Sequence, residues 1–297
     1  MGSTGKVAHN LGDGFRRPVP IGVRVEQGLK SDDYFAEPHL GSTDLKRLEA
    51  SAQFFDAHQR GVIPPTDSSS LSLGRKWHDL LDLGPDVFGN RSVVVPVEYC
   101  TSGGALSTKK DAKEWLASLP EDAITLTPEE SGQLGRMWDG FQNNGASWDI
   151  YENLKHQEIS IFWEWGGVPV KCRPDAITNA GQLVDWKSTR EGNLLKDFRK
   201  AVANFGYGIS AALYEEGCRV AGLATPPMYF VATSTVSYET QVMTLPKTYV
   251  TECRDKLLKL LAEYVTRTEE NHWLPTGYGD IHEIEMWGHS NTKERIL

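Results

Sequence analysis

The feature that most constrains this chain is one stretch, residues 158–190, which reads EISIFWEWGGVPVKCRPDAITNAGQLVDWKSTR. Its first part is rich in β-branched and aromatic residues and ends in a Gly-Gly pair, which is a strong turn signal. A second apolar run starts at Val168 and a third at Gln182, with an Asn-Ala-Gly turn between them. The pattern predicts a three-stranded meander, and therefore a sheet at the centre of the fold.

Acidic residues and one lysine are spread over these predicted strands. Glu158 stands on the first strand, Asp175 on the second, and Asp185 and Lys187 on the third. Because side chains alternate along a strand, Asp185 and Lys187 should share a face, with the carbonyl of Trp186 between them. Carboxylates with a carbonyl form the oxygen-rich site that Mg²⁺ or Mn²⁺ prefers. A nearby lysine can orient or help deprotonate an attacking water and can stabilise phosphoryl charge, so these residues predict metal-assisted phosphodiester hydrolysis.

The same residues resemble a known signature. Pro174-Asp175, nine residues, and then Asp185-Trp186-Lys187 resemble the motif of the PD-(D/E)xK nuclease superfamily. The wider run HQEISIFWEWGGVPVKCRPDAI…LVDWKST is similar to the nuclease domain of the exodeoxyribonuclease VIII (RecE) group. The resemblance implies an α/β fold with a central mixed sheet flanked by helices. It also implies that Asp175 and Asp185 bind metal, that Lys187 is catalytic, and that Glu158 binds a second metal or supports the first through water.

The resemblance extends to residues outside this stretch. His78, in GRKWHDLL, corresponds to a histidine that the upstream helix of such nucleases supplies to the metal. Many relatives carry Gln-x-x-x-Tyr after the lysine strand; here Ser210 replaces the glutamine and Tyr214 is retained, as a DNA contact or as a core residue. Arg173 and Ser188 are further candidates for contact with DNA, although capping of the next helix is the favoured interpretation of Ser188. Other candidate phosphate-binding cations, which could also be ordinary solvated side chains, are Lys171, Lys196, Arg199 and Lys200.

Composition narrows the class of protein without deciding it. The net charge is −9, which disfavours indiscriminate coating of DNA but allows a local basic lining around an acidic metal site. The 4 cysteines show no C-x-x-C spacing, which argues against a disulfide framework, a zinc site or an iron–sulfur cluster and favours a reducing cytoplasm. The resemblance implies that this cytoplasm is that of a bacterial host cell. No apolar run approaches the roughly 18–20 residues that span a bilayer, so we expect no membrane association.

The order of predicted elements gives one nuclease domain over residues 36–275. An irregular N-terminal segment over residues 1–35 precedes it, and an irregular tail over residues 276–297 follows. Gly217 should end a long helix as its C-cap. Helical periodicity covers 42–60, 71–83, 106–119, 127–141, 148–154, 194–216 and 247–267, and further strands are expected at 93–97, 228–235 and 238–244.

The resemblance implies a Mg²⁺-dependent exonuclease, with Mn²⁺ as an alternative metal. Such an enzyme resects duplex DNA ends from the 5′ side in recombination and leaves 3′ single strands for a RecT-type annealing protein. Relatives form homo-oligomeric rings, and a phage or prophage origin fits by analogy. Three alternatives stay open: an endonuclease or end trimmer of the same fold, an inactive DNA-binding or assembly module, and a metal phosphohydrolase acting on nucleotides. The scattered cysteines count against the end trimmer, and the intact acidic and lysine residues count against the inactive module.

Overall fold

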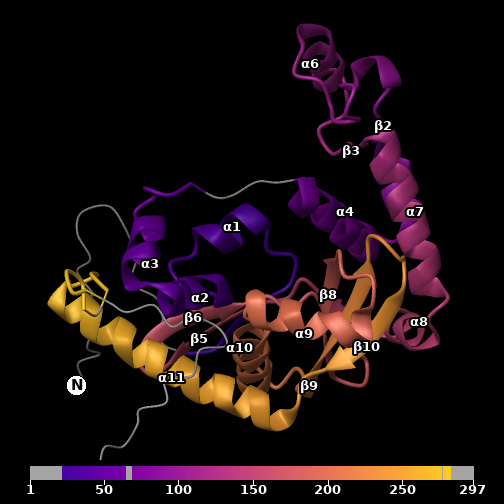
Figure 1. The fold of residues 1–297 in the computed structure, drawn as a ribbon. Helices are drawn as coiled ribbons and strands as arrows, with labels where there is room; N and C mark the ends of the chain where they lie inside the picture. Colours follow the sequence, from indigo (N-terminus) through magenta and orange to yellow (C-terminus); the bar gives the residue numbers. More distant parts are fainter. Residues whose placement is uncertain (1–21, 65–68, 276, 282–297) are drawn as a thin grey trace, which may run out of the picture.

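The computed structural model describes residues 22–64, 69–275 and 277–281, which form an α/β protein (Figure 1). Most of the residues predicted to be irregular, 1–35 and 276–297, lie outside the described ranges. Where the first of these segments is described, it holds a strand and a helix, so the prediction of an irregular segment is wrong there. In chain order the elements are β1 (Arg24–Glu26), α1 (Ser31–Ala36), α2 (Ser42–Ala50), α3 (Ala52–Gln59), α4 (Ser69–Leu83), α5 (Pro85–Arg91), β2 (Ser92–Val94), the 3₁₀ turn η1 (Val97–Tyr99), α6 (Lys110–Ala117), β3 (Ile124–Leu126), α7 (Pro128–Gln142), α8 (Gly145–Glu152), β4 (Leu154–Gln157), β5 (Ser160–Trp165), β6 (Val168–Cys172), β7 (Ala176–Thr178), β8 (Gln182–Thr189), α9 (Leu194–Asn204), α10 (Tyr207–Val220), β9 (Thr225–Ser234), β10 (Thr240–Thr244) and α11 (Lys247–Glu270).

The main sheet has five strands in the order β10-β9-β8-β7-β4, with β8 at its centre. The β8–β9 pair is parallel and the other pairs are antiparallel, which confirms the predicted mixed sheet. A second sheet of three strands has the order β1-β5-β6, and a third holds only the parallel pair β2–β3. Because β8 is hydrogen-bonded on both sides, side chains on it have a closely fixed position.

The predicted meander is divided between two sheets, so its prediction as a single sheet is wrong. Strands β5 and β6 pair with each other in the three-stranded sheet, whereas β7 and β8 pair in the five-stranded one. The chain changes sheet between β6 and β7, where Pro174 has no N–H to donate to a ladder. It also changes sheet between β4 and β5, at Glu158. Both Asp175 and Glu158 therefore lie at changes of sheet and not within strands.

Helices cover both faces of the main sheet (Figure 1). On one face, residues of α2, α3, α9, α10 and α11 form a core with Leu183 and Phe230, and this core continues onto the three-stranded sheet. On the other face, α4, α7 and α8 form a second core around Trp77, Phe141 and Trp186. A site at the edge where these layers meet can draw side chains from both.

Two glycines on the first face explain a prediction that is wrong. Residues 194–216 are not one helix, because Gly206 has a φ of +59° and separates α9 from α10. Gly217 lies inside α10 and does not cap it. A Cβ atom there would be 2.5 Å from the sulfur of Cys172, so glycine allows the helix to pack closely against β6.

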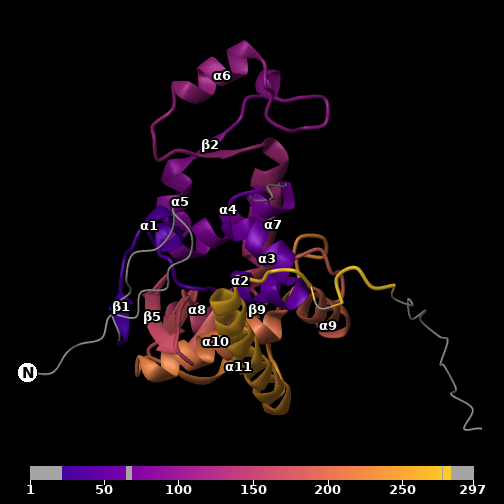
Figure 2. The ribbon, with the colours of Figure 1, turned by 90° about the vertical axis from the view of Figure 1, so that its left-hand side faces the viewer.

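The segment between β2 and β3, which holds α6, extends away from the two cores beyond the N-terminal end of α7 (Figures 1 and 2). The predicted strand and helix in this segment are both present but shorter than expected. Among the described helices, none combines the length and apolar character that crossing a membrane requires.

Candidate active site

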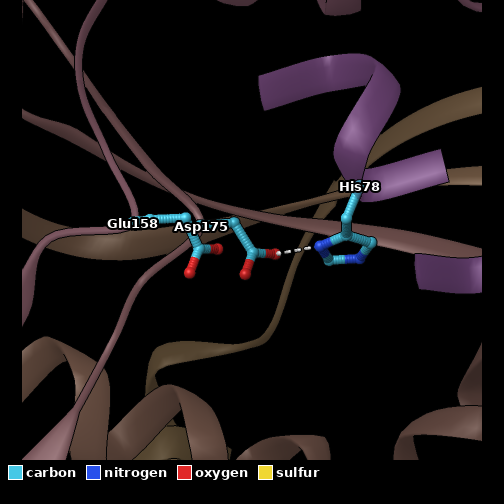
Figure 3. Close-up of side chains that lie close together, drawn as sticks. All are labelled: His78, Glu158 and Asp175. Atoms are coloured by element: carbon cyan, nitrogen blue, oxygen red, sulfur yellow. Dashed lines mark ion pairs between the residues drawn. The ribbon is translucent and has the colours of Figure 1, made fainter. Parts of the chain in front are cut away.

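Three side chains with metal-ligand chemistry meet at the boundary between the sheets: His78 from α4, Glu158 and Asp175 (Figure 3). One ligand atom from each lies within 4.8 Å of those of the other two. His78 Nδ1 is 3.8 Å from Oδ2 of Asp175. The sequence predicted all three as metal ligands. The fold brings them together although His78 and Asp175 are 97 residues apart in the chain (175 − 78).

The two changes of sheet place the carboxylates side by side. The backbone N–H of Glu158 donates to the carbonyl of Asp175 at 3.0 Å, which ties one crossing of the chain to the other. Glu158 has a φ of +49°, a left-handed conformation that is uncommon for residues other than glycine. Oδ2 of Asp175 accepts a hydrogen bond of 2.7 Å from the backbone N–H of Trp186 on β8. The acids are therefore held by backbone contacts on both sides.

Helix α4 is held by the aromatic core beneath it. Trp77 is fully buried, and its ring contacts that of Phe141 edge-on with centroids 5.7 Å apart. Phe141 in turn contacts Trp186 of β8 in the same manner. The next residue along α4 is His78, so burial of Trp77 fixes the height and rotation at which the imidazole reaches Asp175.

The electrostatics of this cluster indicate a missing positive charge. Burial, and then the charge of Asp175, raise the pKa of Glu158 to about 7, against a smaller lowering by Arg173. Burial also raises the pKa of Asp175, which His78 and Lys187 only partly offset. An imidazole and two carboxylates that resist ionisation fit a divalent cation, which would favour their charged forms.

The sequence analysis missed a fourth acid, Asp82, four residues after His78 on α4. Burial, followed by the charges of Glu158, Asp175 and Asp79, raises the pKa of Asp82 to about 8. Its Oδ1 atom is buried and has no hydrogen-bond partner in the described part of the chain. The i,i+4 spacing in HDLLD was the available signal, because such residues share a helix face. We define His78, Asp82, Glu158 and Asp175 as the acidic half of the site.

Lys187 and the buried Asp185 form an ion pair on β8, which confirms that the two side chains share a face. The Lys187 ammonium also donates to the carbonyl of Trp186 at 3.3 Å, and it lies 5.3 Å from the ring centre of Tyr207. Burial alone would lower the pKa of Lys187, but the charges of Asp185 and Asp175 outweigh burial and raise it. Lys187 is therefore a cation next to the acidic half.

Asp185 and the Trp186 carbonyl, both predicted to bind metal, face Lys187 in this structure. Asp185 is not among the three residues whose ligand atoms converge. It lies close enough to Asp175 for its charge to raise the pKa of that carboxyl. Direct coordination by Asp185 and by the Trp186 carbonyl stays a prediction.

Arg173 is buried and directed into the protein. Its guanidinium donates to Ser160 Oγ at 3.0 Å, to the Leu29 carbonyl at 2.9 Å and to Glu158 Oε2 at 3.4 Å. It also stacks on the Tyr34 ring, 4.2 Å from the ring centre. Arg173 therefore joins the N-terminal segment to the acidic half, and its predicted contact with DNA stays untested.

The other predicted DNA-binding residues have diverse surroundings. Ser188 Oγ lies 3.2 Å from the position that a Cβ on Gly74 of α4 would take, so the hydroxyl faces α4. Ser210 is buried on α10. Burial raises the pKa of Tyr214 well above its usual value, and the charges of Asp185 and Asp175 contribute, so its hydroxyl lies near the site. Among the predicted cations, Lys171 is buried and donates to the carbonyls of Tyr34 and Glu37, whereas α9 carries Lys196, Arg199 and Lys200.

Comparisons with known proteins agree with this geometry. A crystal structure titled "Putative exonuclease" from Eubacterium rectale superposes with a TM-score of 0.59 and covers 88% of this chain and 97% of that one, at 13% identity. That identity supports a shared fold only. A second structure, protein VC1899 from Vibrio cholerae, has a TM-score of 0.21 at 11% identity over 85% of this chain and 60% of that one, too low to carry an argument. No curated protein sequence matches the chain significantly.

Residues 41–282 match the family described as PDDEXK-like domain of unknown function (DUF3799). The match spans most of the chain, including α4, both changes of sheet and β8. The mixed five-stranded sheet, its flanking helices and the acidic and lysine residues at its edge all fit a PD-(D/E)xK nuclease. The chain is therefore a member of this PDDEXK-like family.

Proposed function

We propose that this protein is a divalent-metal-dependent exodeoxyribonuclease that resects linear duplex DNA from the 5′ end. The observation that carries the proposal is the junction at Trp186, whose N–H binds Asp175 and whose carbonyl binds Lys187. One residue thereby joins the metal-binding cluster to the cationic group. That arrangement suits hydrolysis of a phosphodiester, in which water adds to phosphorus and one strand oxygen leaves as a hydroxyl.

His78, Glu158 and Asp175 would hold Mg²⁺ or Mn²⁺, with Asp185 as a further ligand. A bound divalent ion supplies Lewis-acid polarisation of the phosphate and lowers the pKa of a coordinated water. The chain's own residues position that chemistry: Arg173 orients the Glu158 carboxyl, and the Trp186 N–H orients Asp175. These contacts would hold both carboxylates in place to bind the cation.

Lys187 acts as a charged donor and not as a base. Its neighbours raise its pKa, so the ammonium keeps its proton at neutral pH. An ammonium beside the metal site stabilises the negative charge that develops on the phosphoryl oxygens. Among the three roles predicted from the sequence, a protonated Lys187 thus supports charge stabilisation and orientation of the water over deprotonation of the water.

Exonuclease action, polarity and partners rest on resemblance. The 158–190 stretch resembles the exodeoxyribonuclease VIII (RecE) group, and the fold is similar to that of the Eubacterium rectale protein whose title names an exonuclease. We also propose that the 3′ single strands are passed to a RecT-type annealing protein and that the nuclease is a ring-shaped homo-oligomer. Its setting would be the cytoplasm of a bacterial host during phage or prophage recombination. Mg²⁺ is the metal proposed for this setting.

The test is digestion of linear duplex DNA labelled separately at each 5′ and 3′ end, with closed circular duplex in parallel. Reactions contain Mg²⁺, Mn²⁺ or EDTA, and the variants are Lys187→Ala and, as a matched control, Lys256→Ala. Lys256 is an exposed lysine of α11 that pairs with Glu49, distant in sequence from the site residues.

We expect metal-dependent release of the 5′ label from linear DNA, unchanged in Lys256→Ala and reduced by about 10³-fold or more in Lys187→Ala. Release of the 3′ label first would reverse the polarity. Cutting of circles would establish an endonuclease instead. DNA binding with no cleavage under any metal would identify an inactive binding module.

A further inference from the structure

A second lysine, Lys46 of α2, lies on the same side of the site as Lys187. Its ammonium is 5.8 Å from the centre of the Tyr207 ring, and the Lys187 ammonium is 5.3 Å from the same centre. The aliphatic stem of Lys46 packs against Gly206, where a Cβ atom would be 3.3 Å from both Cγ and Cδ of the lysine. Lys46 is therefore held in a defined place by the turn that begins α10.

Lys46 has no carboxylate within ion-pair distance in the described part of the chain. Other lysines near the sheets have partners: Lys187 pairs with Asp185, and Lys76 pairs with Glu130 at 2.7 Å. The Lys46 ammonium instead lies over the face of the Tyr207 ring. A partly buried ammonium without a counter-ion has lost hydration with little in return, so an anion that reaches it gains a strong interaction.

The surroundings of Lys46 favour an anion in two further ways. Burial, and then the positive charge of Lys187, lower the pKa of Lys46 to about 8, against smaller raising effects of the Asp185 and Glu49 carboxylates, so repulsion between the two cations outweighs these attractions. Helix α10 also begins at Tyr207 with no side-chain cap, which adds the partial positive charge of a helix N-terminus. A phosphate group, with several acceptor oxygens and a negative charge, relieves both effects.

We propose that Lys46 binds a phosphate of the DNA strand next to the one that is cleaved, and so positions the strand for reaction. The inference rests on the proposed nuclease function, because it takes the acidic half as the place of cleavage. In this arrangement Lys187 contacts the reacting phosphate and Lys46 contacts the neighbouring one, and both ammonium groups lie near the Tyr207 ring. The neighbouring phosphate is either an internal phosphodiester or a 5′-terminal phosphate monoester.

The test compares Lys46→Met, which keeps the stem against Gly206, with Lys46→Arg, which keeps the charge, and with the control Lys259→Met, which changes an exposed lysine of α11. The probe is a short linear duplex with fluorescein at a 3′ end, carrying either a 5′-phosphate or a 5′-hydroxyl. Binding is measured by anisotropy in EDTA over a range of salt concentrations, and melting temperature is measured for each protein. Steady-state cleavage is measured with Mg²⁺.

We expect Lys46→Met to weaken binding about 5- to 30-fold and to lower the slope of log K against log salt by about 0.7–0.9, the value of one phosphate contact. The loss should appear in KM more than in kcat, and Lys46→Arg should recover most of it. The melting temperature should stay unchanged or rise, because the variant removes a repelled and partly desolvated charge. A loss confined to 5′-phosphorylated DNA assigns the contact to the terminal phosphate, and an equal loss on both ends assigns it to an internal one.

Unchanged affinity and salt slope in Lys46→Met would overturn the proposal, and so would a lowered melting temperature that Lys46→Arg does not restore. Because binding is measured without metal, this outcome is separate from failure of the proposed function. Failure of that function would show as a wild-type protein that binds the duplex but does not cleave it, whichever divalent metal is added.

Discussion

The two halves of the site differ in sign and in origin. The acidic half (His78, Asp82, Glu158, Asp175) gathers carboxylates whose pKa values are raised, whereas the basic half (Lys46, Lys187 and Tyr207, with Asp185 as counter-ion) gathers ammonium groups. In the acidic half the cations present only partly offset the carboxylates, and in the basic half Lys46 has no carboxylate within ion-pair distance in the described part of the chain. A divalent metal ion would offset the first imbalance and a phosphate the second.

This difference teaches that the halves should respond in opposite ways when one charge is removed. Removing a carboxyl from the acidic half relieves repulsion between like charges. Removing Lys187 from the basic half leaves the buried Asp185 without its partner.

Asp175→Asn should abolish function and stabilise the metal-free protein. We expect cleavage to fall about 10³-fold or more, because the central ligand of the cluster is lost. The amide oxygen can still accept the Trp186 N–H bond, and the buried charge is gone, so the melting temperature in EDTA should rise by a few degrees, on the order of 1 kcal/mol. Calorimetry with and without Mn²⁺ checks both, and a lower melting temperature in EDTA would contradict the account of a strained acidic half.

Lys187→Met should abolish cleavage to a similar extent but destabilise the metal-free protein. Asp185 is then a buried carboxylate without a counter-ion, which costs about 3 kcal/mol. Urea denaturation in EDTA measures the change in the free energy of unfolding. Equal stability in Lys187→Met and the wild type would mean that the ion pair contributes nothing, and that the two halves are not opposites.

Metal affinity should depend on pH through Glu158. The folded pKa of this carboxyl is about 7, above its usual value of 4.5. Below pH 7 a metal must displace a proton, so Mn²⁺ affinity should fall toward about tenfold per pH unit, and it should level off above pH 8. The metal-free protein should follow the reverse trend: a raised carboxyl pKa stabilises the fold at pH values below about 4.5, and this contribution is lost as pH rises through 7.

Isothermal titration with Mn²⁺ and melting curves between pH 5.5 and 8.5 (roughly the range in which these groups titrate) measure both trends. Glu158→Gln should flatten them in part, with Asp82 responsible for the remainder. Parallel slopes with and without metal would show that the acidic half does not bind the ion.

Arg173→Lys should give the smallest effect and should resolve the role of this residue. Lysine keeps the charge but cannot donate hydrogen bonds to Ser160, Leu29 and Glu158 at the same time. We therefore expect the free energy of unfolding to fall by about 1–2 kcal/mol. DNA binding in EDTA should stay within about twofold of the wild type. Weaker binding with unchanged stability would instead support the contact with DNA that the sequence predicted.

The sequence predicted what depends on local spacing. Alternation along a strand is enough to place Asp185 and Lys187 on one face, and the ion pair follows from it. The sequence could not show that β4–β5 and β6–β7 change sheets, because pairing partners far apart in the chain decide that. Lys46 carries no local signal at all: its position depends on how α2 packs against the turn before α10.

The left-handed backbone at Glu158 has a consequence for how this chain tolerates change. Glycine or asparagine would adopt a φ of +49° more readily, by on the order of 1 kcal/mol. A glutamate there is kept for its side chain at the expense of its backbone. In a selection for thermal stability alone, position 158 should drift to glycine or asparagine early, whereas a selection for cleavage should hold it. The residue found at position 158 after selection would therefore show whether stability or cleavage had been selected.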